Sequence, residues 1–225
     1  MANIAQNLAG IHQQMAAALE RAGRAPDEAR LVAVTKHRSI PATLDVIAAG
    51  ESILGENRIQ EARDKIPQID QDVSWHFIGH LQSNKARIAA QLFDMIQSVD
   101  SERLAAALER EAARLDKRLE LLVQLNIAGE QQKHGLASAR VGELLRAVND
   151  MPHLEACGLM TMAPYSDDPE QSRPIFRDLR QLRDDLRAAG HGELDKLSMG
   201  MTQDFGVAIE EGATLVRIGT AIYAE

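Results

Sequence analysis

The residue best suited to covalent chemistry is a lysine at the end of an apolar run. Residues 31–35 read Leu-Val-Ala-Val-Thr, without polar alternation, and lead into Lys36. Such a run is typical of a strand buried on both faces in a parallel sheet. Ligands bind at the carboxyl ends of these strands, where poor solvation favours the neutral, nucleophilic form of an amine. Lys36 is therefore a candidate for a Schiff base with an aldehyde, the alternative being a lysine that extends into water.

Glycines and hydroxyl residues follow the last two apolar runs of the chain. Ser198 and Gly200 come after a run beginning at residue 196, and Gly219 and Thr220 come after residues 214–218. In eight-stranded barrels, the loops after strands seven and eight often bind phosphate through backbone amides. Either pair alone is also typical of an ordinary turn. Their joint placement favours a phosphate site.

Two further polar residues near strand ends have both structural and ligand-binding explanations. Arg217 lies within an apolar run, where an unpaired guanidinium is costly. It either pairs with a buried carboxylate or points at a ligand. Asn57 is either a cap or loop residue, or a polar contact to a ligand.

For the histidines and methionines, structural roles are the simpler expectation. We expect His80 to be a hydrogen-bonded loop residue and His76 to pack beside Trp75. The methionines at positions 160, 162, 199 and 201 would line a pocket or fill the core. The single cysteine, Cys157, excludes an internal disulfide and a cysteine-based metal site, and no other metal site is predicted.

The bulk properties narrow the class of protein. The 225 residues include 33 acidic and 25 basic side chains, for a net charge of −8 without a basic stripe, so nucleic acid is not an expected partner. No apolar run reaches the ~18 residues that cross a bilayer, so no membrane association is expected. The segment from Met1 to Gln6 lacks the charged and apolar regions of a secretory signal. We expect a cytoplasmic protein.

The order of elements predicts the fold that positions these residues. Apolar residues at helical spacing predict a first helix from Ile4 to about Gly23. Eight apolar runs then alternate with helical segments, beginning near residues 31, 52, 75, 93, 119, 154, 196 and 214. This alternation indicates an α/β fold, a single (β/α)8 TIM-type barrel with an extra N-terminal helix, over one domain of residues 1–225. An open doubly wound sheet is the alternative, although no G-x-G-x-x-G loop follows the first strand.

Six ordered blocks of this sequence resemble the pyridoxal phosphate (PLP) homeostasis family, which is similar in fold to the barrel domain of alanine racemase. The blocks are residues 31–36 (LVAVTK), 55–61 (GENRIQE), 75–85 (WHFIGHLQSNK), 158–162 (GLMTM), 198–201 (SMGM) and 216–220 (VRIGT). Two departures stand out, because Thr35 replaces a usual serine and His80 replaces a common proline.

The resemblance implies a PLP site. Lys36 would hold the cofactor as a Schiff base, and Arg217 would face the pyridine nitrogen. The phosphate would be held by Ser198, Gly200, Gly219 and Thr220, with Asn57 and Met160 beside the cofactor.

The same residues bear on whether the protein is an enzyme. An arginine at the pyridine nitrogen keeps that nitrogen unprotonated, which makes PLP a poorer electron sink. A racemase also needs a second acid or base, for which Tyr165 is the only tyrosine worth testing. We therefore expect a monomeric, non-catalytic PLP-binding protein, without catalytic residues, that buffers the cofactor or delivers it to PLP-dependent apo-enzymes. The alternatives are a small amino-acid racemase and a barrel that binds another phosphorylated metabolite.

Overall fold

The structure is a computed structural model that describes residues 3–129 and 134–225. Residues 1–2 and 130–133 lie outside the described residues. The first two belong to the segment from Met1 to Gln6, for which the sequence predicts no secretory signal.

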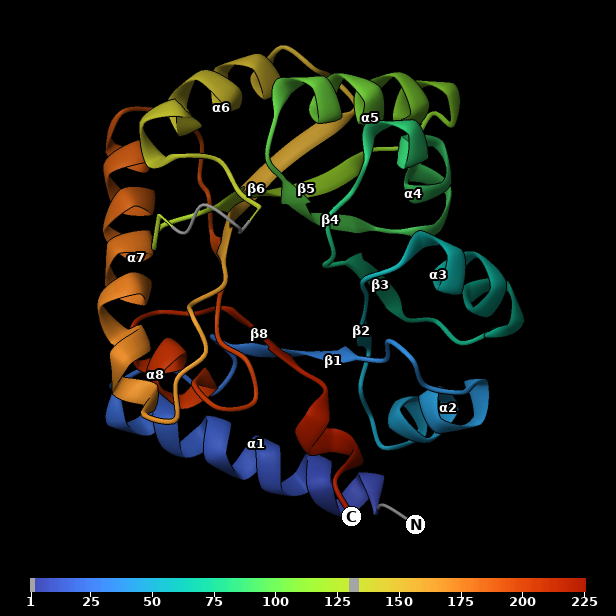
Figure 1. Cartoon of the computed structure of the whole chain (residues 1–225), viewed down its shortest axis with the longest axis vertical. Coiled ribbons are helices and arrows are strands. Elements are labelled where there is room, and N and C mark those ends of the chain that lie inside the picture. The colour runs from blue at the N-terminus through green and yellow to red at the C-terminus, as the bar shows by residue number, and fades with distance from the viewer. Residues whose placement is uncertain (1–2, 130–133) are drawn as a thin grey trace.

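Eight parallel strands form a closed barrel in sequence order (Figure 1). The strands are β1 (Arg30–Val34), β2 (Ile53–Glu56), β3 (Ser74–Phe77), β4 (Met95–Val99), β5 (Leu119–Leu125), β6 (Leu154–Thr161), β7 (Lys196–Ser198) and β8 (Leu215–Ile218). Pairing of β1 with β8, from Arg30 opposite Leu215 to Ala33 opposite Ile218, closes the ring. The predicted (β/α)8 barrel is confirmed, and the open doubly wound sheet is excluded.

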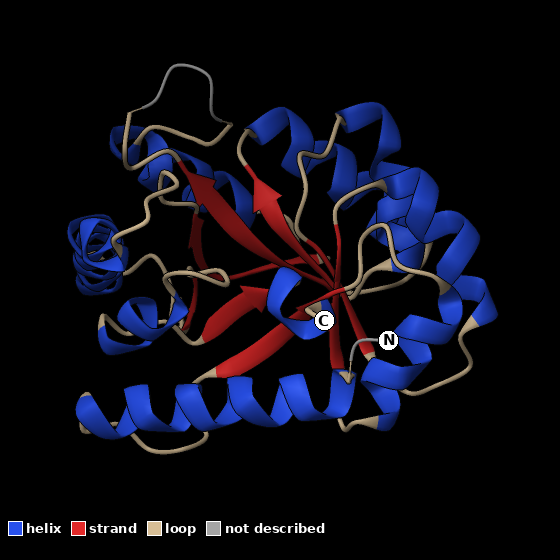
Figure 2. Ribbon diagram, turned by 60° about the horizontal axis from the view of Figure 1, so that its bottom comes forward, coloured by secondary structure: helices blue, strands red, loops and turns tan. Residues whose placement is uncertain are grey.

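Helices surround the strands on the outside of the barrel (Figure 2). They are α1 (Ile4–Arg21), α2 (Ile40–Ala48), α3 (Ile59–Lys65), α4 (Ala86–Leu92), α5 (Glu102–Arg114), α6 (Val141–Asn149), α7 (Arg173–Ala188) and α8 (Phe205–Glu210). Ser39 and Ser101 cap α2 and α5 by accepting hydrogen bonds from Ala42 and Leu104 backbone amides. Within the described residues, none of the helices has both the length and the apolar character needed to cross a membrane.

The helix α4 begins differently from the sequence-based expectation. The pattern suggests that Ser83 caps a helix reaching about Gln91. Instead, residues Ser83–Lys85 form a single 3₁₀ turn, η2, and α4 starts only at Ala86. Ser83 lies inside this turn and makes no capping hydrogen bond, so the prediction of a cap is wrong.

The extra helix α1 occupies the place in the outer layer where a helix following β8 would otherwise pack. After β8 the chain forms only a 3₁₀ turn, η5 (Thr220–Tyr223), where a full helix would otherwise follow. Helix α1 packs on α8, on η5 and on α2 (Figure 1). The Asn7 amide donates hydrogen bonds to the carbonyls of Ile222 (3.1 Å) and Ala224 (2.9 Å), which ties the end of the chain to its beginning.

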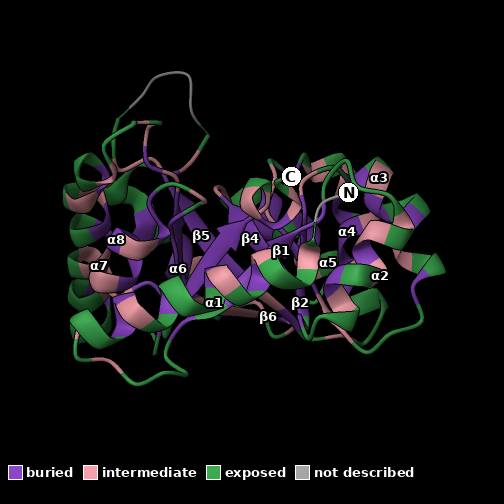
Figure 3. Cartoon of the chain, turned by 90° about the horizontal axis from the view of Figure 1, so that it is seen from below, coloured by how far each residue is buried: buried purple, intermediate pink, exposed green. Residues whose placement is uncertain are grey.

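Two apolar regions hold the barrel together. The larger one lies between the sheet and the helices, whose outer faces are exposed (Figure 3). The smaller one lies inside the barrel and consists of Val32, Ile53, Met95, Leu122, Met160 and Leu215. Buried polar side chains, among them Gln97, Ser198 and Arg217, also lie inside the barrel.

Candidate functional site

Lys36 lies immediately beyond β1 at the carboxyl rim of the barrel and is exposed. Within the described chain, its amine makes no hydrogen bond and no ion pair. Most lysines held in a structural role bind carboxylates or carbonyls, so an unengaged amine at this rim is available to a ligand. The predicted placement of Lys36 at the end of the first strand agrees with this position. The expectation that the amine is poorly solvated is wrong, because the side chain lies just beyond the strand and is exposed.

The residue before Lys36 is fixed by a buried ion pair. The Thr35 hydroxyl donates to Oε1 of Glu56 at 2.7 Å, and the Thr35 carbonyl accepts from Nζ of Lys65 at 2.7 Å. Lys65 also donates to Oε1 of Glu56 at 2.8 Å, and Glu56 has no exposed surface. Both the side chain and the carbonyl of Thr35 are thereby held, which sets the direction in which the chain leaves β1. Sequence reasoning missed Glu56 and Lys65; a carboxylate within an apolar strand was the available signal.

A carboxylate of helix α3, Glu61, holds the turn after Lys36. His37 adopts a left-handed backbone conformation with φ of 59°. Its amide donates to Oε2 of Glu61 at 3.1 Å, and its Nδ1 lies 3.1 Å from Oε1 of the same carboxylate. Lys36 therefore sits between two anchored residues, on a backbone with little freedom to move.

A buried polar network crosses the barrel interior below the rim. Arg217 donates to Oγ of Ser198 at 2.5 Å and to the carbonyl of Thr161 at 2.9 Å. Ser198 in turn donates to Oε1 of Gln97 at 2.6 Å, and the Gln97 amide meets Nδ1 of His76 at 2.9 Å. Four strands thus contribute side chains to one connected network.

Among the described residues, no carboxylate lies within ion-pair distance of Arg217. Within this part of the chain, the structure therefore excludes the predicted alternative of an ion pair between Arg217 and a buried carboxylate. Burial lowers the pKa of Arg217 to about 10, while Asp204 acts in the opposite direction. The guanidinium is still protonated at neutral pH. A buried cation without a counterion is costly, and a ligand that accepts hydrogen bonds would offset that cost.

His76 lies inside the barrel rather than beside Trp75, so that prediction is wrong. Neighbouring residues of a strand point to opposite faces, and Trp75 packs in the outer apolar region. Burial, with smaller effects of Lys196 and Arg30, lowers the pKa of His76 to about 3. The imidazole is therefore neutral at physiological pH and can hold the Gln97 amide.

This pKa predicts acid sensitivity. Between pH 6.5 and about 3 the unfolded chain carries a proton on His76 that the folded protein does not, so the free energy of unfolding falls as pH falls. From pH 7 to pH 5, His76 should remove about 2 kcal/mol. Urea unfolding of wild type and His76→Asn, which keeps an acceptor for Gln97 but cannot titrate, measures this difference. An equal loss in both proteins would contradict the assignment.

The residues predicted to bind phosphate lie at the carboxyl ends of β7 and β8. Gly200 has φ of 91°, and an added Cβ would lie 2.5 Å from Cβ of Ala208, so only glycine fits there. Gly219 packs on β1, where an added Cβ would lie 3.2 Å from Cβ of Val34. Thr220 is exposed at the start of η5, whereas Ser198 is buried and its hydroxyl is engaged by Arg217 and Gln97. Their role in binding phosphate stays a prediction.

Asn57 and Met160 occupy different environments. Oδ1 of Asn57 is buried and has no hydrogen-bond partner among the described residues, so it can accept a donor from a ligand. An added Cβ on Gly79 would overlap the Asn57 carbonyl, so the backbones after β2 and β3 approach closely there. Met160 is fully buried in the interior apolar layer, as a core residue. Its predicted contact with a cofactor stays a prediction.

The two tyrosines differ in accessibility. Tyr165, in the loop after β6, is 74% exposed, and its hydroxyl donates to Asp167 and accepts from Gln203. The Tyr223 hydroxyl is buried without a partner among the described residues, and burial raises the pKa of Tyr223 to about 12. The Arg38 guanidinium lies 4.1 Å from the centre of the Tyr223 ring, which places this tyrosine beside the Lys36 turn. The sequence offered no sign of that placement.

The closed barrel, with its polar carboxyl rim, falls in a known structural class. The family described as "Alanine racemase, N-terminal domain" matches residues 6–225. The fold is shared with an alanine racemase from Clostridium difficile 630 (TM-score 0.81, 14% identity), over 99% of this chain and 56% of that one.

Relatives that match along their whole length are more similar. The "Pyridoxal phosphate homeostasis protein" of Aquifex aeolicus is 38% identical over 224 residues, or 99% of this chain and 98% of the relative. The protein of that name from Escherichia coli K12 is 39% identical over 99% of this chain and 97% of its own. PipY from Synechococcus elongatus, solved with PLP bound, has a TM-score of 0.87 and 33% identity, covering 99% of this chain and 100% of PipY. The chain belongs to the pyridoxal phosphate homeostasis protein family.

Proposed function

We propose that this protein binds PLP through a Schiff base on Lys36 and takes part in intracellular vitamin B6 homeostasis, by buffering or delivering the cofactor. The observation that carries the proposal is the exposed, unengaged amine of Lys36 at the carboxyl end of β1. The names of the relatives and the PLP in the PipY structure support the choice of ligand.

The residues present fit this cofactor in three respects. Arg217 is a buried cation without a carboxylate counterion among the described residues, and it would donate to an unprotonated pyridine nitrogen. Asn57 has a buried, unpartnered acceptor. Gly200 and Gly219 lie at the ends of β7 and β8, where their backbone amides and the Thr220 hydroxyl would bind the phosphate. Ser198 would bind the phosphate from the end of β7, where its hydroxyl now contacts Arg217 and Gln97.

When bound, PLP supplies an aldehyde that condenses with a lysine amine with loss of one water. The protein's part is to present that amine. The Thr35–Glu56–Lys65 contacts and the Glu61–His37 contacts hold the backbone on both sides of Lys36, so the side chain reaches the site from a fixed position.

We further propose that the protein has no turnover of its own, is monomeric and forms one domain over residues 1–225. A cationic Arg217 at the pyridine nitrogen would weaken the ring as an electron sink. Tyr165, which sequence reasoning selected as the candidate acid or base, is widely exposed to water. The closed barrel leaves no sheet edge that needs a partner. The recipients of the cofactor would be PLP-dependent apo-enzymes in the cytoplasm.

The test measures binding and turnover in one preparation. Protein mixed with PLP is expected to show a visible absorption band at one equivalent per chain. Incubated with amino acids in deuterated water, the loaded protein is expected to exchange no α-proton. A protein that stays colourless contradicts PLP binding and favours another phosphorylated ligand. Exchange that disappears in Tyr165→Phe would instead establish a small racemase.

A further inference from the structure

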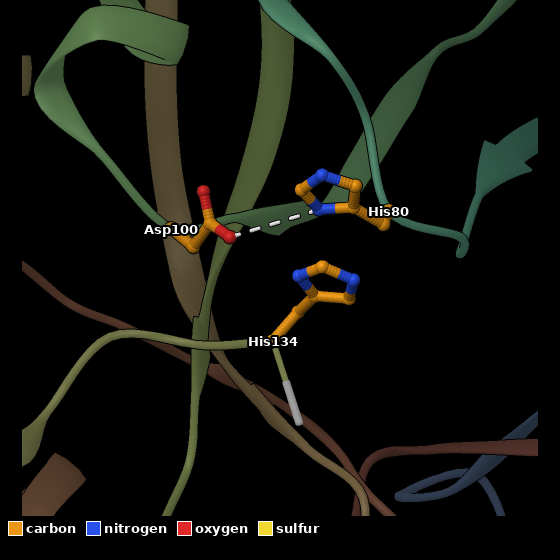
Figure 4. Close-up of side chains that lie close together, drawn as sticks. All are labelled: His80, Asp100 and His134. Carbon is orange, nitrogen blue, oxygen red and sulfur yellow. Dashed lines mark ion pairs between the residues drawn. The ribbon is translucent and has the colours of Figure 1, made fainter. Parts of the chain in front are cut away.

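Two histidines and an aspartate from three separate loops meet at the carboxyl rim of the barrel (Figure 4). His80 follows β3, Asp100 follows β4, and His134 lies in the connection between β5 and α6. One nitrogen of each ring and one carboxylate oxygen lie within 4.8 Å of one another. Nδ1 of His80 is 3.9 Å from Oδ2 of Asp100, and the two rings stack with centroids 3.7 Å apart.

This arrangement differs from a hydrogen-bonded loop histidine. Within the described chain, His80 makes no hydrogen bond, and its neighbours are another imidazole and a carboxylate. Neutral imidazole nitrogen and carboxylate oxygen are ligands for transition metals.

We propose that His80, Asp100 and His134 bind a divalent transition-metal ion of the zinc type. Zinc bonds imidazole and carboxylate at about 2.0–2.2 Å, so tetrahedral ligand atoms lie about 3.4 Å apart. The 3.9 Å between Nδ1 of His80 and Oδ2 of Asp100 is close to this spacing. The two stacked rings would turn out of their parallel arrangement so that a lone pair of each points at the ion. No thiolate contributes, because the lone Cys157 lies within β6, so zinc or cobalt(II) is favoured over copper(I).

The position of His134 is fixed by the barrel. Its carbonyl accepts a hydrogen bond from the Gln124 side chain at 3.1 Å. Leu136 continues this attachment, since its amide donates to the Gln124 carbonyl at 2.8 Å and its carbonyl accepts from Asn126 at 3.1 Å. Gly135 has φ of 131°, and an added Cβ would lie 2.7 Å from the Asn126 nitrogen, so the backbone between them packs tightly on β5. The imidazole of His134 therefore starts from an anchored segment.

The side of the cluster toward η2 and α5 is open. A groove of about 540 Å³ runs beside it, lined by His80, Ser83, Asp100 and Arg103 among others. The His80 side chain is 40% exposed and that of Asp100 18% exposed, so an ion can enter from water. Zinc sites with three protein ligands keep a fourth position for water. A bound ion would join the loops that follow β3, β4 and β5.

Zinc binding to the full-length, untagged protein tests the proposal. Native mass spectrometry and competition with a chromophoric chelator are expected to show one Zn²⁺ per chain, and Co²⁺ to give the visible bands of a tetrahedral site. His80→Ala, His134→Ala and Asp100→Asn should each weaken zinc binding at least about tenfold. Loss of even an outer-shell partner of a metal ligand lowers metal affinity by about tenfold or more, and these three residues would bind the ion directly. His153→Gln is the matched control, because His153 also pairs with a carboxylate, Glu109, at 2.8 Å but forms part of no three-residue cluster among the described residues.

Any of three results would overturn the proposal. The wild type could fail to bind one Zn²⁺ per chain, the wild type and all three variants could bind zinc equally, or the control His153→Gln could lose zinc binding. Binding that depends on both histidines but persists in Asp100→Asn would exclude the three-ligand site. Circular dichroism of each variant establishes that it is folded. Repeating the titration with Lys36→Ala separates this site from the PLP site, because zinc binding is expected to be unchanged there.

Discussion

Lys36→Ala is expected to abolish covalent attachment of PLP, while the protein remains folded. The reason is that the Lys36 amine is exposed and unengaged, whereas Lys65, behind it, donates to Glu56 and to the Thr35 carbonyl. Borohydride reduction of the loaded protein, followed by peptide mass mapping, should place the cofactor on Lys36 in the wild type. The variant should retain no trapped cofactor.

Two further variants separate chemistry from charge. Lys36→Arg keeps a cation at the rim but supplies no condensing amine, so it should also trap nothing. Lys85→Ala removes a half-buried lysine from η2, on the loop after β3, and should trap one equivalent like the wild type. Trapping of a full equivalent by Lys36→Ala would show that another amine carries the cofactor, and would remove the basis of the proposed function.

Lys65→Met is expected to cost on the order of 3–5 kcal/mol of unfolding free energy, because it leaves the Glu56 carboxylate buried without its cation. Glu56 already has one oxygen, Oε2, without a hydrogen-bond partner among the described residues. The remaining donor to Oε1 would be the Thr35 hydroxyl. Urea unfolding at pH 7 measures the loss.

The double variant Glu56→Leu/Lys65→Met provides the decisive comparison. Removing both charges eliminates the buried, unpaired carboxylate, so the double variant should recover more than half of the stability lost by Lys65→Met. Lys85→Met is the matched control for loss of a lysine that pairs with no carboxylate among the described residues, and should change stability by less than about 0.5 kcal/mol. The single variant Glu56→Leu completes the cycle. A double-variant cost equal to the sum of the costs of Lys65→Met and Glu56→Leu would mean that the ion pair has no coupling energy.

The strand order and the rim position of Lys36 could be predicted because they follow from local patterns. Each buried strand is a short apolar run, and the helical spacing between runs specifies what must lie between them. The extra helix α1 was visible for the same reason. These features depend on residues close together in the sequence, which is where single-sequence reasoning is strongest.

Contacts across the barrel interior could not be predicted in this way. When both faces of a strand are buried, the sequence does not say whether Trp75 or His76 faces inward, and the structure places His76 inside. The partner of Arg217 is likewise set by register, since Ser198 pairs opposite Leu215 on the neighbouring strand. The ion pair between Glu56 and Lys65 joins β2 to α3, and both side chains are buried. The sequence does not show that these two charged residues are buried together.

The first and last strands of the barrel supply different parts of the proposed site. Lys36 follows the first strand, whereas Arg217 and Thr220 come from the last strand and the turn after it, next to the residues that Asn7 holds. A variant truncated before Val216 would keep the Lys36 amine but lose Arg217, Thr220 and the strand pairing that closes the barrel, so under the proposed function it should not retain PLP.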